Sequence, residues 1–371
     1  MPVTVLHLNT ESEWRGGEAQ TLYLAEGLTA RGRRSLLVGQ PGSPLLARGR
    51  AAGLETISVP MRGEFDLVAV RRLAAIVHAE GAGLLHYHSA HAVTLGSLAT
   101  LITGRRPAVA SRRVSFPLRS GPLARLKYTF RVDRVIAVSE AIRRRLIGRG
   151  LPPERVVTVH SGIDPARFAH GDRERFRSSL GVGAAALPRE AFLIGTVGHL
   201  AAHKGIDLFL QAAALAAPEL PRARFVVVGR GEREDALRRL ALGLAGRVVF
   251  AGFRDDIPDA YAGLDLFVLP STSGEGSPAA LKEAMASGTP LVATALDGVE
   301  EIIEDGRHGL LTPPGNAPAL ARAMVILASD ADLRSRLAEA GRRRVLEFTT
   351  VRMVERTVEV YRSIGGASWD V

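Results

Sequence analysis

Residues 274–290 read GEGSPAALKEAMASGTP, a glycine- and serine-containing loop followed by an alanine-rich segment of helix-forming residues. Pro278 stands where that helix would begin, because the fixed φ of proline suits the first helical position. Gly288 stands where a left-handed C-terminal cap would follow. The apolar run LDLFVLP, residues 264–270, precedes the loop, and a second apolar run starts at Leu291. The stretch therefore predicts a strand, a glycine-rich loop, a helix and another strand.

The loop and the helix start predict a site for an anion with two carboxylates beside it. Backbone N–H groups and the helix dipole favour a negative group such as a phosphate at a helix N-terminus. Glu275 lies in the loop, and Glu283 lies five residues beyond Pro278, about 7.5 Å further along the axis at about 1.5 Å per residue. Carboxylates accept hydrogen bonds from hydroxyls, so the pair can hold a sugar and a ribose of one extended ligand.

The run from Glu275 to Ala293 resembles the E-x7-E signature of retaining glycosyltransferases of family 4, which have the two-domain GT-B architecture. The resemblance implies that Glu275 contacts hydroxyls of the donor sugar and that Glu283 binds the ribose of the nucleotide. It also implies that Gly276, Ser277 and Pro278 face the donor phosphates. The alternative is an ordinary surface helix that happens to carry two glutamates. Such a helix does not need the glycine-rich loop, the proline, the eight-residue spacing and the glycine cap, and all four occur together here.

Apolar strand patterns alternate with helical patterns in both halves of the chain, which predicts an α/β fold of two doubly wound, Rossmann-like domains facing a central cleft. We expect an acceptor-binding domain over residues 1–170 and a nucleotide-sugar-binding domain over residues 190–349. The resemblance to GT-B proteins implies that a C-terminal helix, about residues 350–371, packs back on the first domain.

Two further segments of the second half resemble donor-binding segments of the family. Residues 195–205, GTVGHLAAHKG, match the segment that grips the donor diphosphate, with Lys204 as its cation. His199 stands where the family usually has a permanent cation. Arg230 follows the apolar strand 226–228 and either touches phosphate or is a solvated loop cation. The resemblance implies catalysis by Lys204 and Glu275 without a metal ion or cofactor, because the protein itself offsets the charge of the leaving diphosphate.

The first half carries two weaker resemblances. Gly16 and Gly17, in RGGEAQ at residues 15–20, resemble the glycine loop that faces the donor diphosphate and the acceptor. His88, in LLHYHSAH at residues 84–91, matches the histidine that family members carry near the donor sugar and facing the acceptor. The resemblance makes it a third catalytic candidate beside Glu275 and Lys204, although a core or helix-capping histidine is the alternative. His86 and His91 make a metal site imaginable, but no cysteine or nearby carboxylate completes one, so we expect no metal.

Cysteine content, apolar runs and charge limit the chemistry, the location and the partners of the protein. The chain of 371 residues has no cysteine, which excludes disulfides and thiol chemistry. Its first residues read as a strand and not as a signal peptide, and no run of 18 apolar residues occurs, so we expect a cytoplasmic protein. Residues 105–155 hold 14 basic and three acidic residues. This excess indicates an anionic partner, such as the inner face of the cell membrane or a charged acceptor, or else serves solubility alone.

The sequence predicts transfer of a sugar from a nucleotide diphosphate sugar to a glycan or lipid-linked acceptor, in the biosynthesis of cell-surface polysaccharide or lipopolysaccharide. A nucleotide-sugar epimerase or a sugar phosphorylase of the same fold is one alternative. A cationic nucleic-acid-binding protein is another, but aromatic residues make up only 5% of the chain and do not alternate with the basic ones, so we expect no nucleic acid. The donor sugar, its base and the acceptor cannot be read from the sequence.

Overall fold

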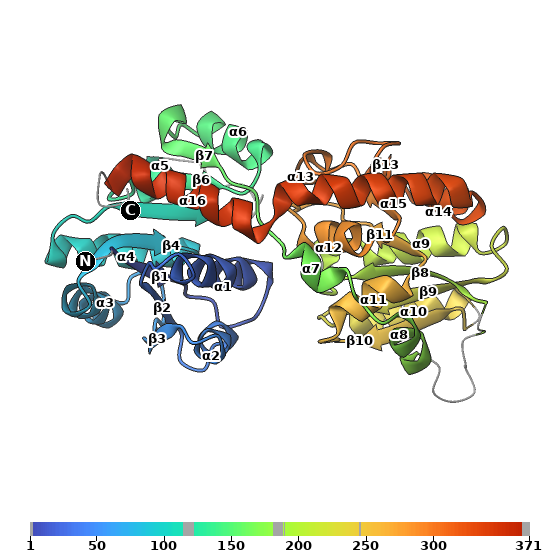
Figure 1. Cartoon of the computed structure of the whole chain (residues 1–371), viewed down its shortest axis with the longest axis horizontal. Coiled ribbons are helices and arrows are strands. Elements are labelled where there is room, and N and C mark those ends of the chain that lie inside the picture. The colour runs from blue at the N-terminus through green and yellow to red at the C-terminus, as the bar shows by residue number, and fades with distance from the viewer. Residues whose placement is uncertain (1–2, 114–121, 181–187, 189, 245, 366–371) are drawn as a thin grey trace. The chain divides into compact units, whose positions relative to one another are not determined.

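The computed structural model describes residues 3–113, 122–180, 188, 190–244 and 246–365 (Figure 1). The described residues divide into two compact units. The first unit contains those from the N-terminal part up to Gly162 together with those from Thr350 onward, and the second runs from Ile163 to Thr349. No helix in these ranges combines the length and the apolar character needed to cross a membrane.

The first unit is built on a parallel sheet of seven strands. Its central strands are buried along their whole length, as expected for a parallel sheet covered on both faces. In spatial order the strands are β3 (Glu55–Ser58), β2 (Ser35–Gly39), β1 (Thr4–Leu8), β4 (Ala82–Tyr87), β5 (Ala108–Arg112), β6 (Arg134–Ala137) and β7 (Val156–Thr158). Strand order reverses between β1 and β4, which is where ligands of such sheets gather.

Helices cover both faces of this sheet (Figure 1). Their N-termini are capped by side chains in several cases, for example by Asp66, whose carboxylate accepts from the backbone N–H groups of Val68 and Ala69. The helices are α1 (Gly16–Thr29), α2 (Pro44–Ala51), α3 (Leu67–Ala79), α4 (Ala90–Thr103), α5 (Pro122–Thr129), α6 (Glu140–Gly148) and the 3-10 helix η1 (Pro153–Arg155).

The last helix of the chain, α16 (Thr350–Gly365), belongs to the first unit. It packs against α1, where a Cβ on Gly27 would lie 2.5 Å from Cγ2 of Val354, so glycine permits the close approach of the two helices. Tyr361 of α16 is fully buried beneath the sheet. The remainder of the expected C-terminal helix, residues 366–371, lies outside the described residues.

The second unit is a parallel sheet of six strands. In spatial order they are β10 (Val248–Gly252), β9 (Ala223–Val228), β8 (Phe192–Val197), β11 (Leu266–Leu269), β12 (Leu291–Thr294) and β13 (Leu310–Thr312). Strand order reverses between β8 and β11, so this sheet has the same kind of switch point as the first. Both units are doubly wound α/β structures, as the sequence predicts.

The helices of the second unit also form two layers. One layer holds α9 (Ile206–Ala216), α10 (Glu234–Ala241), η3 (Leu242–Leu244) and α14 (Ala317–Ser329). The other holds α7 (Pro165–Phe168), α8 (Arg173–Ser179), α11 (Ile257–Gly263), α12 (Ala279–Ser287) and α13 (Asp297–Glu300). The remaining elements are η2 (Ala202–Lys204), α15 (Ala331–Val345) and η4 (Leu346–Phe348).

Two details differ from the sequence prediction. The first unit ends at Gly162 and not at residue 170, because Phe168 of α7 packs in the core of the second unit with Tyr261. Pro278 is the residue before the helix, and α12 begins at Ala279. The predicted cap at Gly288 is confirmed, with φ of 72° in the left-handed region.

Candidate active site

The loop between β11 and α12 holds the first predicted carboxylate at the switch point of the second sheet. Glu275 is buried, with 7% of the residue exposed. Its Oε1 accepts hydrogen bonds from Lys204 Nζ at 2.7 Å and from Ser271 Oγ at 2.6 Å. Lys204 ends η2, which follows β8, so the sheet order brings together two predicted residues that lie 71 positions apart. The ammonium has three donors, and one of them is used by Glu275.

Two glycines fix the backbone of this region. Gly205 has φ of 64°, and a Cβ there would lie 2.0 Å from the carbonyl oxygen of Pro270. A Cβ on Gly298 would lie 2.4 Å from the carbonyl oxygen of Gly276. The backbone on both sides of Glu275 is therefore packed against glycines, and larger residues at these two positions would displace the loop.

The second predicted carboxylate lies in the interior of α12. Glu283 Oε2 accepts a hydrogen bond from the hydroxyl of Tyr261 at 3.0 Å. Burial raises the pKa of Glu283, an effect that the hydrogen bond from Tyr261 and the positive charges of Arg167 and Lys282 oppose. The hydroxyl holds this carboxylate in one orientation in the middle of the helix.

Sequence reasoning missed Lys282, which sits between the two carboxylates in the same motif. The residue is completely buried, and its Nζ donates to Ser277 Oγ at 2.9 Å. Burial lowers the pKa of Lys282 to about 7, with Glu283 acting in the opposite direction. One signal in the sequence marks it: Lys127, Lys204 and Lys282 are the only lysines among 48 basic residues.

Two further predicted donor contacts, His199 and Arg230, lie on neighbouring loops of the second sheet. The backbone N–H of Leu200 donates to the carbonyl of Arg230 at 2.9 Å, which joins the loop after β8 to the loop after β9. His199 Nε2 lies 3.1 Å from Glu232 Oε2, and 47% of the histidine side chain is exposed. The structure thus places a carboxylate next to His199.

In the first unit, Gly16 and Gly17 begin α1 at the end of β1. Glu18 of the same turn is buried and accepts from Arg15 N at 3.0 Å and from Asn9 Nδ2 at 3.2 Å. Burial raises the pKa of this carboxyl, and the hydrogen bonds partly offset that effect. The glycine loop is therefore held by a buried carboxylate that sequence reasoning did not select.

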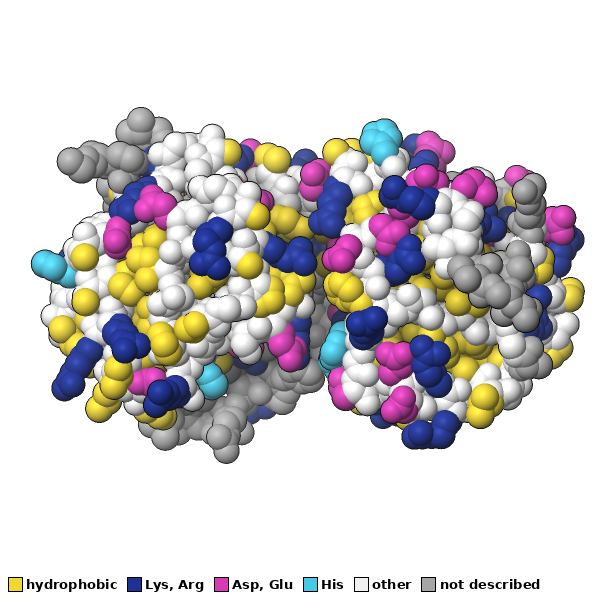
Figure 2. All heavy atoms as spheres, turned by 90° about the horizontal axis from the view of Figure 1, so that it is seen from below, with side chains coloured by type: hydrophobic (Ala, Val, Ile, Leu, Met, Phe, Trp, Pro, Cys, Tyr) yellow, Lys and Arg dark blue, Asp and Glu magenta, His cyan; other side chains and the backbone are white. Residues whose placement is uncertain are grey.

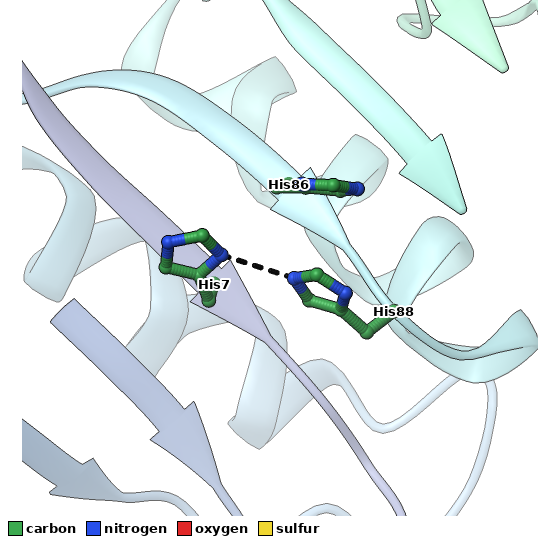
Figure 3. Close-up of side chains that lie close together, drawn as sticks. All are labelled: His7, His86 and His88. Carbon is green, nitrogen blue, oxygen red and sulfur yellow. Dashed lines mark hydrogen bonds between the residues drawn. The ribbon is translucent and has the colours of Figure 1, made fainter. Parts of the chain in front are cut away.

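His88 lies at the switch point of the first sheet, in contact with His7 of β1 and close to His86 of β4 (Figure 3). His7 Nδ1 and His88 Nε2 are 3.0 Å apart. His86 Nδ1 contacts the hydroxyl of Tyr361 at 2.5 Å, and His86 Nε2 contacts Ser111 Oγ at 2.8 Å. His91, the third member of the imagined metal site, is exposed on α4 instead.

Arg113, which sequence reasoning also missed, sets the direction of the hydrogen bonds in this cluster. Its Nη2 lies 3.0 Å from His88 Nδ1, and a guanidinium only donates, so Nδ1 accepts. Neutral His88 then carries its hydrogen on Nε2 and donates to His7. Burial lowers the pKa of His7 to about 3 and the pKa of His88 well below its usual value, and it lowers the pKa of Arg113 to about 10.

The nitrogens of His7, His86 and His88 that could bind a metal all lie within 4.8 Å of one another. Most of them already have hydrogen-bond partners, and a guanidinium adjoins His88. Among the described residues, His7 Nε2 and Arg113 Nε are the buried side-chain nitrogens of this cluster that have no hydrogen-bond partner. The arrangement fits a hydrogen-bond relay that begins at the Arg113 guanidinium and passes through neutral His88 to neutral His7.

We expect acid to destabilise the first unit through this cluster. An unfolded imidazole has a pKa of about 6.5, whereas folded His7 has a pKa of about 3. Between these values the unfolded chain binds a proton that the folded chain does not, so stability falls as the pH drops from about 7 toward 3. His7 alone should contribute about 2 kcal/mol of this loss at about pH 5. Denaturant unfolding followed over this pH range measures it.

The matched variant for this prediction is His7→Asn. Its side-chain oxygen can accept from His88 Nε2 but does not titrate. The variant should lose stability less steeply than the parent as the pH falls. Equal slopes for the two proteins would contradict the assignment of the acid sensitivity to His7.

Comparison with known proteins places this geometry in a family. The model of Glycosyltransferase Family 4 matches residues 14–167, and the model of Glycosyl transferases group 1 matches residues 191–330. The lipopolysaccharide core biosynthesis glycosyltransferase LpsE of Rhizobium meliloti is 33% identical over 220 residues, which cover 58% of this chain and 60% of that protein. The chain thus spans about three fifths of the length of that relative.

Other matches extend over almost the whole chain. The 2-deoxystreptamine N-acetyl-D-glucosaminyltransferase of Streptomyces fradiae is 31% identical over 410 residues, covering 95% of this chain and 93% of that protein. The crystal structure of Anabaena HepE in complex with UDP-glucose superposes with a TM-score of 0.85 at 24% identity, covering 97% of this chain and 99% of that one. The fold is that of the GT-B glycosyltransferases. The chain belongs to glycosyltransferase family 4.

Proposed function

We propose that this glycosyltransferase is retaining and independent of metal ions. It transfers a sugar from a nucleotide diphosphate sugar to a glycan or lipid-linked acceptor in the synthesis of cell-surface polysaccharide or lipopolysaccharide. The observation that carries the proposal is the contact of Lys204 and Ser271 with Glu275, directly before the start of α12. The relatives named for lipopolysaccharide core synthesis and for aminosugar transfer support the reaction class.

The second unit binds the donor in this proposal. Glu275 holds hydroxyls of the sugar, and Glu283 holds the ribose. The diphosphate lies at the N-terminus of α12, against the backbone of Gly276 and Ser277 and before Pro278. Lys204, which also pairs with Glu275, adds its ammonium to the partial charge of the helix end, which by itself contributes only about 0.3–1 kcal/mol. Together they stabilise the leaving diphosphate without a metal ion.

The engagement of Glu275 by Lys204 and Ser271 favours a binding role for this carboxylate over a nucleophilic one. Its Oε1 accepts hydrogen bonds from two donors at 2.6–2.7 Å. These bonds make the carboxylate less nucleophilic and fix its orientation. We therefore assign to the protein no nucleophile: the acceptor attacks the face of the sugar from which the diphosphate leaves, and the configuration at the anomeric carbon is retained.

The first unit binds the acceptor. His88 is neutral because of its burial, and its two ring nitrogens bond Arg113 and His7, so it supports the acceptor side through these hydrogen bonds and not as a cation. Gly16 and Gly17 leave the start of α1 open to a phosphate or sugar. His199 and Arg230, on their adjoining loops, complete the donor contacts, and the carboxylate of Glu232 holds the imidazole in place.

The test begins with binding and ends with product stereochemistry. Thermal shift with UDP-, GDP- and ADP-sugars identifies the donor, and transfer is then measured with excess chelator present. An α-linked donor sugar should give an α-linked product by NMR. An inverted product, or activity lost with chelator and restored by one metal ion, would overturn the corresponding part of the proposal. Conversion of the donor alone would instead identify an epimerase.

The second carboxylate gives a separate expectation. Glu283→Ala should weaken binding of the nucleoside diphosphate by about tenfold or more, since a hydrogen bond to a charged group contributes about 1.5–3 kcal/mol. The turnover number should change less, because the ribose does not react. Titration calorimetry with the nucleoside diphosphate and saturation kinetics measure the two effects. A loss confined to turnover would assign Glu283 to the reacting sugar.

We also propose that the first unit contacts an anionic membrane. Two features support it: the basic excess of residues 105–155, and large apolar side chains that are exposed on the same unit. These are Phe65, Leu67, Val68, Leu101, Ile102, Leu126 and Phe130. In the view of Figure 2, basic side chains lie singly among apolar and uncharged ones instead of forming one continuous patch. Such a surface combines charge attraction with insertion of apolar side chains.

Vesicle sedimentation checks the membrane proposal. Vesicles with acidic lipid should retain the protein at low salt and release most of it near 0.5 M salt, where the Debye length is about 4 Å. Neutral vesicles should retain little. Equal retention by neutral and acidic vesicles would show that the positive charge serves solubility and not docking.

A further inference from the structure

The lysines of this chain are few, and their positions are informative. Of 48 basic residues only three are lysine. Lys204 contacts Glu275 and Lys282 contacts Ser277, so two of the three lysines contact the loop between β11 and α12. The third, Lys127, pairs with Glu64 in the other unit. Arginine and lysine differ in shape and donor geometry, so a chain that uses arginine almost everywhere retains the compact ammonium at this site.

Lys282 is placed by the geometry of α12. It is the fourth residue of the helix, and helical side chains lean toward the N-terminus of their helix. Its Nζ therefore lies beneath the helix start, 2.9 Å from Ser277 Oγ and 5.6 Å from the ring centre of Phe348 in η4. Neither end of the side chain reaches solvent, because the residue is 0% exposed.

This is an unfavourable place for a cation in the protein alone. The partial positive charge of a helix N-terminus repels a nearby ammonium, and burial penalises its charged form. Both penalties fall when an anion occupies the helix start, since a neighbouring negative charge favours the protonated amine. Local disagreements of this kind between residue and environment concentrate at functional sites.

We propose that Lys282 is a positioning residue of the donor site, which orients the Ser277 hydroxyl toward the diphosphate of the nucleotide sugar. An ammonium only donates, so Ser277 Oγ accepts from it and keeps its own O–H for another acceptor. The serine stands immediately before Pro278 at the helix start, where the proposed function places the phosphates. Lys282 thus acts on the diphosphate through Ser277 and contributes its buried charge at short range. The inference rests on the proposed function.

A mutant cycle with two ligands tests it. The variants are Lys282→Met, Ser277→Ala, their combination, and Lys127→Met as a matched lysine removal in the other unit. Calorimetry measures binding of UDP, GDP and ADP to the parent, and the tightest of these is compared with its nucleoside. Lys282→Met and Ser277→Ala should each weaken binding of the nucleoside diphosphate by about tenfold or more. Binding of the nucleoside should weaken by less than about twofold. The double variant should bind no worse than the weaker single variant, within about twofold.

Thermal unfolding separates this role from a structural one. Lys282→Met should unfold at the same temperature as the parent or higher, because it removes a buried charge. The inference would be overturned if the two losses of diphosphate affinity multiply in the double variant. It would also be overturned if the affinities for diphosphate and nucleoside fall equally, or if Lys282→Met keeps the diphosphate affinity of the parent. Failure of the parent to bind any of the three diphosphates would instead overturn the proposed function, and this inference with it.

Discussion

Glu275→Gln should reduce the turnover number by at least about 100-fold while the protein remains folded. The carboxylate is proposed to hold hydroxyls of the reacting sugar, and each hydrogen bond to a charged group contributes about 1.5–3 kcal/mol. The amide would offer one acceptor in place of two and would direct an N–H group at either the sugar or Lys204, which lies 2.7 Å away. Because the partner of Glu275 is the reacting sugar, the loss should appear in turnover more than in affinity for the nucleoside diphosphate.

Steady-state kinetics with the donor found by the thermal-shift screen provides the measurement. Glu304→Gln is the matched control, since it neutralises an exposed carboxylate of the same unit that pairs with Arg307. The control should keep the activity of the parent. If Glu275→Gln retains full turnover, the assignment of the sugar hydroxyls to this residue is wrong.

Gly229→Ala should destabilise the second unit by at least about 3 kcal/mol, because strain and a steric clash act together. Gly229 has φ of 134°, a backbone conformation that residues with a Cβ rarely adopt. A Cβ at this position would also lie 1.8 Å from the carbonyl oxygen of Gly198. The change should separate the loops after β8 and β9, which carry His199 and Arg230, and so weaken donor binding as well. Denaturant unfolding and donor titration measure the two effects.

Gly243→Ala is the control for this prediction. Gly243 lies in η3 with no atom within 4 Å of the added Cβ, so alanine there should be neutral or stabilising by up to about 1 kcal/mol. The contrast between the two variants isolates the packing of the two loops from the general effect of removing a glycine. Similar unfolding midpoints for both variants would contradict the expected clash.

The strand, loop and helix around Glu275 were predictable because their signals are local in the sequence. A proline before a helix, a glycine after it and a carboxylate in a glycine-rich loop act through backbone geometry within a few residues. The cap at Gly288 and the doubly wound α/β fold follow from such short-range patterns. Lys204 could be chosen by its resemblance to a known segment, although its contact with Glu275 could not.

The contacts that distinguish this chain depend on sheet order, register and packing, which short-range patterns do not specify. His7 meets His88 across 81 positions, because β1 and β4 are neighbours in the sheet. His86 meets Tyr361 across 275 positions, because the last helix returns to the first unit. Lys282 reads in the sequence as a solvated helix lysine. The tertiary structure instead buries it completely, with Phe348 among its neighbours, because burial depends on residues that are remote in the chain.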